Sequence, residues 1–282
     1  MSESRVALVT DSTSYLPSEL AAENGVEVVA LQVVIGGTAY DEGGGTSSAT
    51  VAEALRSWTP VTTSRPGPAA FAQAYERAAA RGCDGVVSVH LSSQMSGTVD
   101  SARLAAKDSP IPAEVVDSGS LGMGFGFAVL AAARAAAGGG SVEEVARIAS
   151  ERAHASSVIF YVDTLEHLRR GGRIGPAAAL VGSALSVKPL LHLVGGHIEP
   201  LEKVRTSSKA IARLEELAVQ RAGAGQVVVA VHHLANPDRA AALAQRLRER
   251  LSGLGDLRVS EVGAVVGAHV GPGMLAVVVA PR

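Results

Sequence analysis

The 282-residue sequence has a single cysteine, few aromatic residues and no strong excess of either charge. Cys83 alone cannot form an intramolecular disulfide, and without a CxxC or Cys/His cluster there is no pattern for structural zinc. A formal net charge of -2, with mixed signs along the chain, gives no basic stripe of the kind that nucleic-acid binding needs. We therefore expect no disulfide framework, no metal and no nucleic-acid partner.

Signal-peptide and membrane-span patterns are missing too. The first residues, MSESRVALVTDS, are polar and then strand-like, without a basic region followed by a sustained apolar stretch. The longest apolar run, residues 121–137, is interrupted by glycines and by Arg134. We expect a cytoplasmic protein that makes at most transient contact with a membrane surface.

Small residues take the place of the aromatic ones. Aromatics make up 3% of the chain, whereas there are 31 glycines and 47% of all residues are hydrophobic. A GC-rich genome explains this composition, and internal space for a long ligand is the other interpretation. In either case the chain can bury a substantial core.

The first half of the chain alternates strand and helix patterns. Apolar, β-rich runs and helical stretches follow one another, with strands expected at 5–10, 28–34, 85–90 and 113–117 and helices at 50–57 and 69–80. This alternation predicts a mostly parallel sheet flanked by helices. Ligands of such sheets gather beyond the carboxyl ends of the strands.

The second half differs in texture. Apolar arms on either side of Gly195-Gly196 predict a β-hairpin over residues 190–204. Further strands and helices follow, with strands expected at 226–231, 257–262 and 274–279 and helices at 208–219 and from Asn236-Pro237 onward. The sequence thus predicts an α/β fold of two α/β domains, residues 1–156 with the parallel sheet and residues 157–282 with a mixed sheet and helices.

Hydroxyl residues gather at two places. Thr62, Thr63 and Ser64 directly precede a proline-stiffened entry to a helix, where they are either caps and turn residues or ligand contacts. Residues 91–98, LSSQMSGT, lead from a strand into a helix expected to begin near Val99. Hydroxyls, backbone N–H groups and a helix dipole together favour a phosphate or carboxylate, although a capped helix explains the same pattern.

Three other features have two interpretations each. Asp11, after the first strand, is either a loop organiser or an acidic catalytic group. His269, in a glycine-rich segment expected to form a loop between apolar strands, either contacts an anion or makes a structural hydrogen bond. The basic clusters at 169–173 and 203–206 are either solvated charge or a surface for phosphates or an acidic partner.

Seven motifs in register resemble the DegV family over the whole chain: VTDSTSYLP, TTSRPGP, VHLSSQMSGT, VDSGSLGMG, LRRGGRIG, VKPLLHLVGGHIEPLEKVRT and GAHVGPGML. Members of that family bind fatty acids, and in bacteria with a fatty acid kinase they carry the acid while it becomes an acyl phosphate for phospholipid synthesis. The resemblance implies a carrier without cofactor or catalytic residues, which binds a long-chain fatty acid in a buried tunnel and presents its carboxylate to a partner kinase.

The resemblance also implies roles for single residues. Thr63 and Ser96 match the hydroxyl residues that hold the carboxylate in the family, and His269 matches a third contact with the headgroup. Thr62 and Ser93 flank the hydroxyl pair and are second choices. By the same resemblance, the domain of residues 1–156 binds the fatty acid and that of residues 157–282 closes the headgroup site.

Arginines complete the implied site. Arg173 and Arg205 match family arginines associated with docking to the kinase and with handling the phosphate. Arg65 stands where members of the family usually have glutamine. Because Arg65 adjoins Thr63, this departure changes the local charge and raises the question of ligand preference.

An enzyme remains the alternative to a carrier. A stand-alone phosphotransferase or hydrolase would use the same anion site, with Asp11 or His269 as base. No GxSxG motif supports a serine hydrolase, although Ser, His and Asp are all present. A purely regulatory interaction protein is a third possibility, and it would bind no ligand.

Overall fold

The computed structural model describes residues 5–180 and 188–282. By its contacts the chain divides into two compact units, unit 1 formed by residues 1–32 and 64–155 and unit 2 formed by residues 33–63 and 156–282. Unit 2 thus takes in residues 33–63, which the expected continuous segments, 1–156 and 157–282, assign to the first domain. The TTSR segment is where the chain passes back from unit 2 to unit 1, between Thr63 and Ser64.

Unit 1 is built on a four-stranded sheet whose strands all run parallel. The strand order is β2-β1-β7-β8, with β2 (Val26–Val29), β1 (Val6–Asp11), β7 (Gly85–His90) and β8 (Ala113–Asp117). Every residue of β7 is buried, as a central strand covered on both faces requires. The predicted parallel sheet is therefore confirmed.

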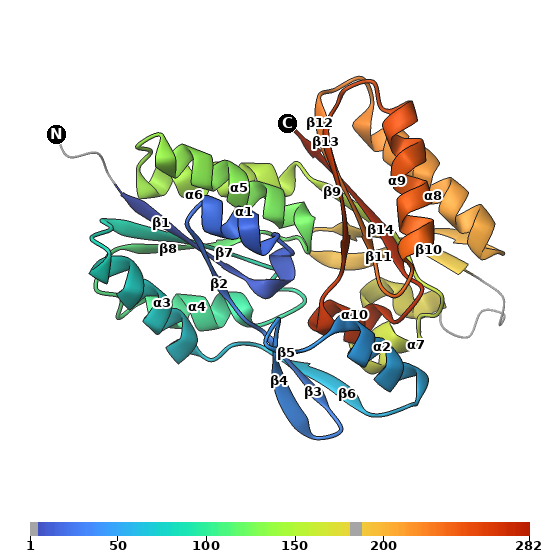
Figure 1. Cartoon of the computed structure of the whole chain (residues 1–282), viewed down its shortest axis with the longest axis horizontal. Helices are drawn as coiled ribbons and strands as arrows, with labels where there is room; N and C mark the ends of the chain where they lie inside the picture. Colours follow the sequence, from blue (N-terminus) through green and yellow to red (C-terminus); the bar gives the residue numbers. More distant parts are fainter. Residues whose placement is uncertain (1–4, 181–187) are drawn as a thin grey trace. The chain divides into compact units, whose positions relative to one another are not determined.

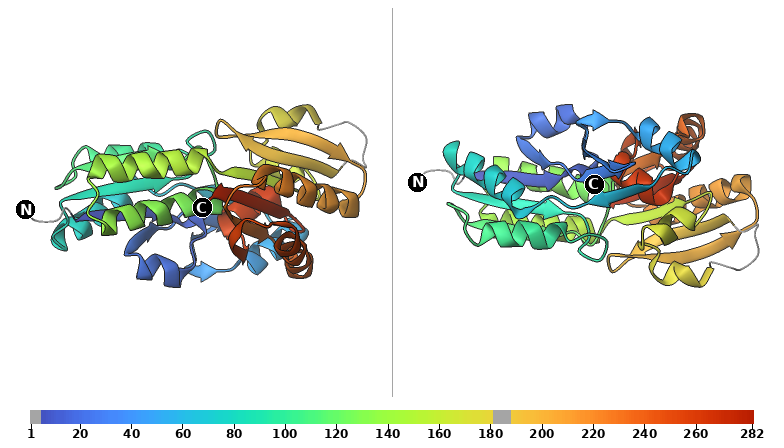
Figure 2. Two further views of the ribbon diagram at one scale, coloured as in Figure 1. Left: turned by 90° about the horizontal axis from the view of Figure 1, so that it is seen from above. Right: turned by 90° about the horizontal axis from the view of Figure 1, so that it is seen from below.

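Helices cover both faces of this sheet. One face carries α3 (Pro68–Ala80) and α4 (Thr98–Ala106), and the other carries α5 (Met123–Ala137) and α6 (Val142–His154) (Figure 1). The short α1 (Ser18–Glu23) packs against β2. Helices α5 and α6 lie side by side, as the view from above shows (Figure 2). The sequence pattern marked the 121–137 run only as apolar, and the structure shows α5 to be a buried core helix.

Unit 2 contains a six-stranded mixed sheet, as expected from the sequence. Its order is β11-β10-β9-β14-β12-β13, with β11 (His197–Val204), β10 (Lys188–Val194), β9 (Ser157–Tyr161), β14 (Leu275–Pro281), β12 (Val227–His233) and β13 (Leu254–Glu261). Strands β10 and β11 form the predicted hairpin, and β12 and β13 are the parallel pair in this sheet. Helices α8 (Ser207–Ala222) and α9 (Pro237–Arg250) pack against it (Figure 1).

Smaller elements complete unit 2. A second sheet has the order β5-β4-β3-β6, with β5 (Gly45–Thr46), β4 (Thr38–Glu42), β3 (Gln32–Ile35) and β6 (Val61–Ser64). Helices α2 (Ser48–Arg56) and α10 (Ala264–Val270) pack on each other through a small core of Val33, Val51, Ala264 and Ala268. Helix α7 (Glu166–Arg170) contacts α10. These contacts fix α10, which carries His269.

One predicted strand is wrong. The apolar run 28–34 was expected to be continuous, but it divides into β2, which pairs with β1, and β3, which belongs to the second sheet. Between them, the Leu31 N–H donates to the Ser12 hydroxyl at 3.0 Å and is lost to any strand ladder. The apolar pattern continues across the break, so hydrophobicity alone could not reveal it.

Candidate functional site

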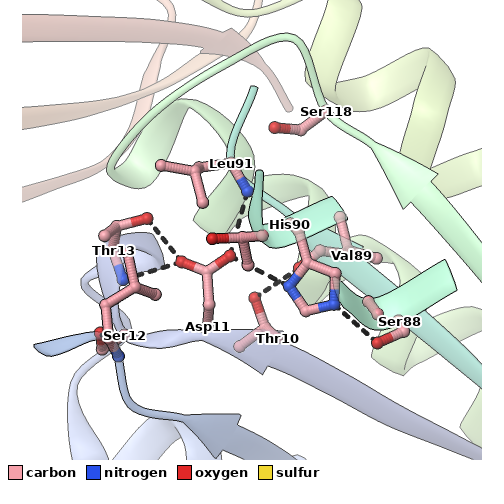
Figure 3. Close-up of polar contacts among 12 residues, drawn as sticks. Thr10, Asp11, Ser12, Thr13, Ser88, Val89, His90, Leu91 and Ser118 are labelled. Atoms are coloured by element: carbon pink, nitrogen blue, oxygen red, sulfur yellow. Dashed lines mark hydrogen bonds and ion pairs between the residues drawn. The ribbon is translucent and has the colours of Figure 1, made fainter. Parts of the chain in front are cut away.

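A buried polar network joins the carboxyl ends of β1 and β7 in unit 1. The Asp11 carboxylate accepts four hydrogen bonds: two from the backbone N–H and hydroxyl of Thr13, at 3.0 and 2.5 Å, and two from the Leu91 N–H and the His90 ring, both at 3.0 Å. Asp11 and His90 are fully buried. Figure 3 shows Asp11 between the two strand ends, with the His90 ring turned toward it.

The network continues through the other nitrogen of His90. Nε2 lies 2.7 Å from the Ser88 hydroxyl, which in turn accepts from the Tyr75 hydroxyl at 3.0 Å. Since a carboxylate only accepts hydrogen bonds, His90 Nδ1 carries the proton shared with Asp11. Ser88 can then donate to Nε2 of a neutral imidazole, and every group is satisfied. Burial raises the pKa of Tyr75 to about 12, against the opposing effect of the Ser88 bond, so Tyr75 stays a donor.

This order of groups, Ser88–His90–Asp11, is that of a hydrolase triad, but it is closed to substrate. The side chains of Asp11, His90 and Ser88 are completely buried, and the Tyr75 hydroxyl donates a hydrogen bond to the Ser88 hydroxyl. All lone-pair sites of the Asp11 carboxylate are occupied, so Asp11 cannot serve as a base toward a ligand. The structure therefore supports the loop-organising interpretation of Asp11.

The segment 91–98 follows β7 and is held by its neighbours. The Ser92 N–H donates to the Ser120 carbonyl at 2.9 Å, and the Ser93 N–H donates to the Asp117 carboxylate at 3.1 Å. Helix α4 begins at Thr98, close to the predicted start. The Ser96 hydroxyl lies 2.9 Å from the Thr98 hydroxyl, at the amino end of α4. Ser93 and Ser96 are both partly buried in unit 1.

In unit 2, Thr63 contacts His269. The Thr63 hydroxyl oxygen lies 2.8 Å from His269 Nε2, so two residues 206 positions apart meet through their side chains. Thr62 and Thr63 belong to strand β6 rather than to a helix cap, and Thr62 is exposed whereas Thr63 is partly buried. The capping interpretation of these two hydroxyls is therefore wrong, because Gly67 precedes α3 as its N-cap.

His269 lies on helix α10, not in the expected loop. Glycines at 267, 271 and 273 suggested a loop, but Gly267 sits inside the helix, where an added Cβ would meet the Leu234 side chain at 3.2 Å. Glycine at position 267 therefore makes room for the packed Leu234 side chain and does not make the segment flexible. Gly271, with φ of 74°, ends the helix in the left-handed region.

The electrostatics keep His269 neutral. Burial and, second, the positive charge of Arg173 lower the pKa of His269 from 6.5 to about 4. Its Nδ1 is buried and has no hydrogen-bond partner among the described residues. Arg173 is exposed and donates to the Gly171 carbonyl at 2.7 Å. The structure thus groups Thr63, His269 and Arg173 in unit 2.

Two glycines make room for two histidines in this group. A Cβ built on Gly171 would lie 2.1 Å from His269 Nδ1, and one built on Gly271 would lie 2.1 Å from the His167 ring. Gly171 of the GGRIG segment therefore faces His269 of the GAHVGPG segment, and Gly271 of the GAHVGPG segment faces His167 on α7. Sequence reasoning missed His167 and both glycine roles, since spacing along the chain cannot show which glycine faces which ring.

The other predicted residues belong to other elements of the fold. Ser93 and Ser96 belong to unit 1, as described above. Arg205 is exposed at the end of β11, next to Thr206, the N-cap of α8. Within residues 5–180 and 188–282, no three His, Cys, Asp or Glu side chains lie as a metal site would need. In the same part of the chain no helix has the length and apolarity to cross a membrane.

Comparisons with known proteins cover the chain almost end to end. Residues 5–282 match the family model described as "Uncharacterised protein, DegV family". A DegV domain-containing protein of Streptomyces coelicolor is 59% identical over 277 residues, with 98% of this chain and 99% of that protein covered.

Solved structures resemble the chain equally completely. A DegV family protein of Thermus thermophilus, described by its fatty acid binding, has a TM-score of 0.93 at 35% identity, with 99% of this chain and 100% of that chain covered. DegV of Bacillus subtilis, described as a fatty acid binding protein, has a TM-score of 0.90 at 33% identity, again with 99% and 100% covered. With the family match and these relatives spanning both units, the chain belongs to the DegV family.

Proposed function

We propose that this protein binds a long-chain fatty acid in the cytoplasm and presents the carboxylate to a partner fatty acid kinase, which converts it to an acyl phosphate for phospholipid synthesis. The protein itself supplies binding and no catalytic residue. The Thr63–His269 pair is the observation that carries the headgroup assignment, and the fatty-acid-binding relatives support the ligand class.

The pair has two polar hydrogens, and the hydrogen bond between its members uses only one of them. A neutral imidazole carries one N–H, and threonine carries one O–H. If Nε2–H donates to Thr63, the hydroxyl hydrogen is left over. If Thr63 donates to Nε2 instead, the hydrogen on the partnerless Nδ1 is left over. A carboxylate, which only accepts, can take the left-over hydrogen, and the nearby Arg173 charge favours an anion.

Ser96 is proposed as the second hydroxyl that contacts the carboxylate, with Thr62 and Ser93 as flanking residues. Neutral donors suffice for the headgroup because the acyl chain supplies most of the affinity. Each buried methylene contributes about 0.8 kcal/mol, so a long chain offers roughly 10 kcal/mol before the costs of association. We propose that the acyl chain of the fatty acid is buried in the domain of residues 1–156.

We propose that holding the carboxylate by hydroxyl donors, rather than by a tight arginine–carboxylate fork, leaves its oxygen free for phosphorylation. Arg173 and Arg205 are both exposed, which suits the proposed role of facing the kinase and the transferred phosphate. The Ser88–His90–Asp11 arrangement gives the hydrolase alternative no open nucleophile.

Extraction of freshly purified protein with organic solvent, followed by mass spectrometry, tests the ligand. We expect a fatty acid at near one-to-one stoichiometry, and palmitate should bind again after delipidation. With ATP and a fatty acid kinase, acyl phosphate should form on the wild type and be strongly reduced with Thr63→Ala and Ser96→Ala. Normal acyl phosphate formation with both variants would show that the headgroup assignment is wrong. Turnover of a phosphoester without a partner protein would favour an enzyme.

A further inference from the structure

The Arg65 side chain lies on the turn that carries Ser96. Its Nη1 donates to the Gly97 carbonyl at 3.4 Å. A Cβ built on Gly97 would lie 1.8 Å from that Nη1 and 2.9 Å from Cζ, so the guanidinium occupies the space a side chain at 97 would need. Arg65 and Gly97 both belong to unit 1. A charged group is therefore packed onto the residue that follows Ser96.

The charge of Arg65 is not neutralised by a described neighbour. By contrast, two other exposed arginines of unit 1 are paired, Arg77 with Glu27 at 2.6 Å and Arg147 with Glu151 at 2.8 Å. Among the described residues the only hydrogen bond of Arg65 goes to a backbone carbonyl, which carries no net charge. The positive charge thus remains available to an anion bound nearby.

The neighbourhood of Arg65 already favours negative charge. Helix α4 directs its amino end toward residues 96–98, and the Ser96 and Thr98 hydroxyls lie 2.9 Å apart there. One acidic residue, Asp100, lies in the first turn of α4 and opposes this effect. Arg65 adds a full positive charge beside the helix end and the two hydroxyls, and this strengthens the attraction for an anion. The negative charge of Asp100 weakens that attraction.

We propose that Arg65 is a specificity-determining residue, which acts by charge on the ligand's headgroup and makes the Ser96 site prefer more negative headgroups. This inference rests on the proposed fatty-acid site. Because Coulomb energy grows with the ligand's charge, Arg65 strengthens binding of an acyl phosphate more than of a fatty acid, and leaves a neutral fatty alcohol unaffected. The carrier would then hold its phosphorylated product more firmly than its substrate.

The test uses three ligands of equal chain length: hexadecanol, palmitate and hexadecyl phosphate. Dissociation constants are measured for delipidated wild type, Arg65→Gln and Arg65→Lys at low and high salt. For an exposed charge at low salt, we expect Arg65→Gln to weaken palmitate about threefold and hexadecyl phosphate about tenfold, with hexadecanol unchanged. Arg65→Lys should retain most of the effect, and at about 0.5 M salt the differences should largely vanish.

Two further variants sharpen the result. Arg103→Gln removes an exposed arginine from the last turn of α4, at the end away from Ser96. It should leave all three affinities unchanged. Asp100→Asn removes the opposing charge and should strengthen hexadecyl phosphate by about twofold at low salt. Thermal melting checks that each variant is folded.

The outcomes separate this inference from the proposed function. If the wild type binds none of the three ligands, the fatty-acid site itself is wrong. If the wild type binds them and Arg65→Gln weakens hexadecanol as much as palmitate, or changes no affinity, Arg65 does not act by charge and the inference fails.

Discussion

Two histidines, one in each unit, meet hydroxyl groups in opposite ways. His90 in unit 1 uses both ring nitrogens, between Asp11 and Ser88, and packs edge-on against Phe71 with ring centroids 4.9 Å apart. His269 in unit 2 uses one nitrogen, toward Thr63, and its other nitrogen has no partner among the described residues. The first arrangement is complete without a ligand, and the second has a hydrogen left to donate.

A histidine with a purely structural role differs in its hydrogen bonds from one that is open to a ligand. Both residues are buried or nearly so, and both contact a hydroxyl, so neither burial nor residue type distinguishes them. Hydrogen-bond accounting does, because buried polar groups are normally satisfied and an unsatisfied one needs an explanation. The difference leads to unequal effects on stability and on binding when each network is broken.

The largest expected effect is on stability, from Asp11→Asn. The amide cannot accept all four hydrogen bonds, and one NH2 hydrogen would face the buried donors of Thr13 or Leu91. We expect the free energy of unfolding to fall by about 3 kcal/mol, as measured by denaturant titration. Asp108→Asn, at an exposed position, is the matched control and should change it by less than about 0.5 kcal/mol. A loss below about 1 kcal/mol for Asp11→Asn would contradict the structural role.

A smaller change in the free energy of unfolding is expected when the pH is lowered, because of two histidines in unit 2. Burial lowers the pKa of both His232 and His269 from 6.5 to about 4. Between these pH values the unfolded chain binds protons at the two imidazoles and the folded chain does not, so the free energy of unfolding falls as the pH drops from 6.5 to 4.

Substitution of His269 should remove part of that pH dependence. We expect His269→Gln to reduce the loss between pH 6.5 and 4 by on the order of 2 kcal/mol, with urea unfolding at each pH as the measurement. His154→Gln, at an exposed position, is the control and should leave the curve unchanged. An unaltered slope in His269→Gln would show that His269 is not held neutral in the folded chain.

Ligand affinity tests the packing that holds His269. Gly171→Ala places a methyl group where His269 Nδ1 lies, and the ring must turn away from Thr63. We expect palmitate to bind about tenfold more weakly, which corresponds to about 1.4 kcal/mol, in a titration with delipidated protein. Gly225→Ala meets its nearest neighbour at an ordinary 3.5 Å and is the matched control. Equal affinities for the two variants would mean that the position of His269 does not matter.

Much of the fold could be predicted from the sequence. The alternation of strands and helices predicted the parallel sheet, and Gly195-Gly196 predicted the β10–β11 hairpin correctly. The break after Val29 and the membership of residues 33–63 in unit 2 could not be predicted, because both depend on which strands pair and the apolar pattern runs on regardless.

The candidate site could be predicted from the sequence only in part. The motifs singled out Thr63, Ser96 and His269, but the chain alone could not show that Thr63 contacts a histidine 206 positions away. The roles of Gly171 and His167 depend on packing at close range, and the Ser88–His90–Asp11 network depends on adjacent parallel strands. Such contacts between distant segments leave no periodic signal in a single sequence.

We propose that the Thr63–His269 pair contacts the fatty acid carboxylate, whereas the His90 network does not. Palmitate labelled with carbon-13 at the carboxyl group, bound to delipidated protein and observed by NMR, tests this most directly. Thr63→Val should shift the bound carboxyl resonance and weaken binding, and Ser88→Ala, which removes a hydroxyl from the other network, should leave the resonance in place. A resonance that is unchanged in Thr63→Val, or that moves in Ser88→Ala alone, would show that the Thr63–His269 pair does not contact the carboxylate.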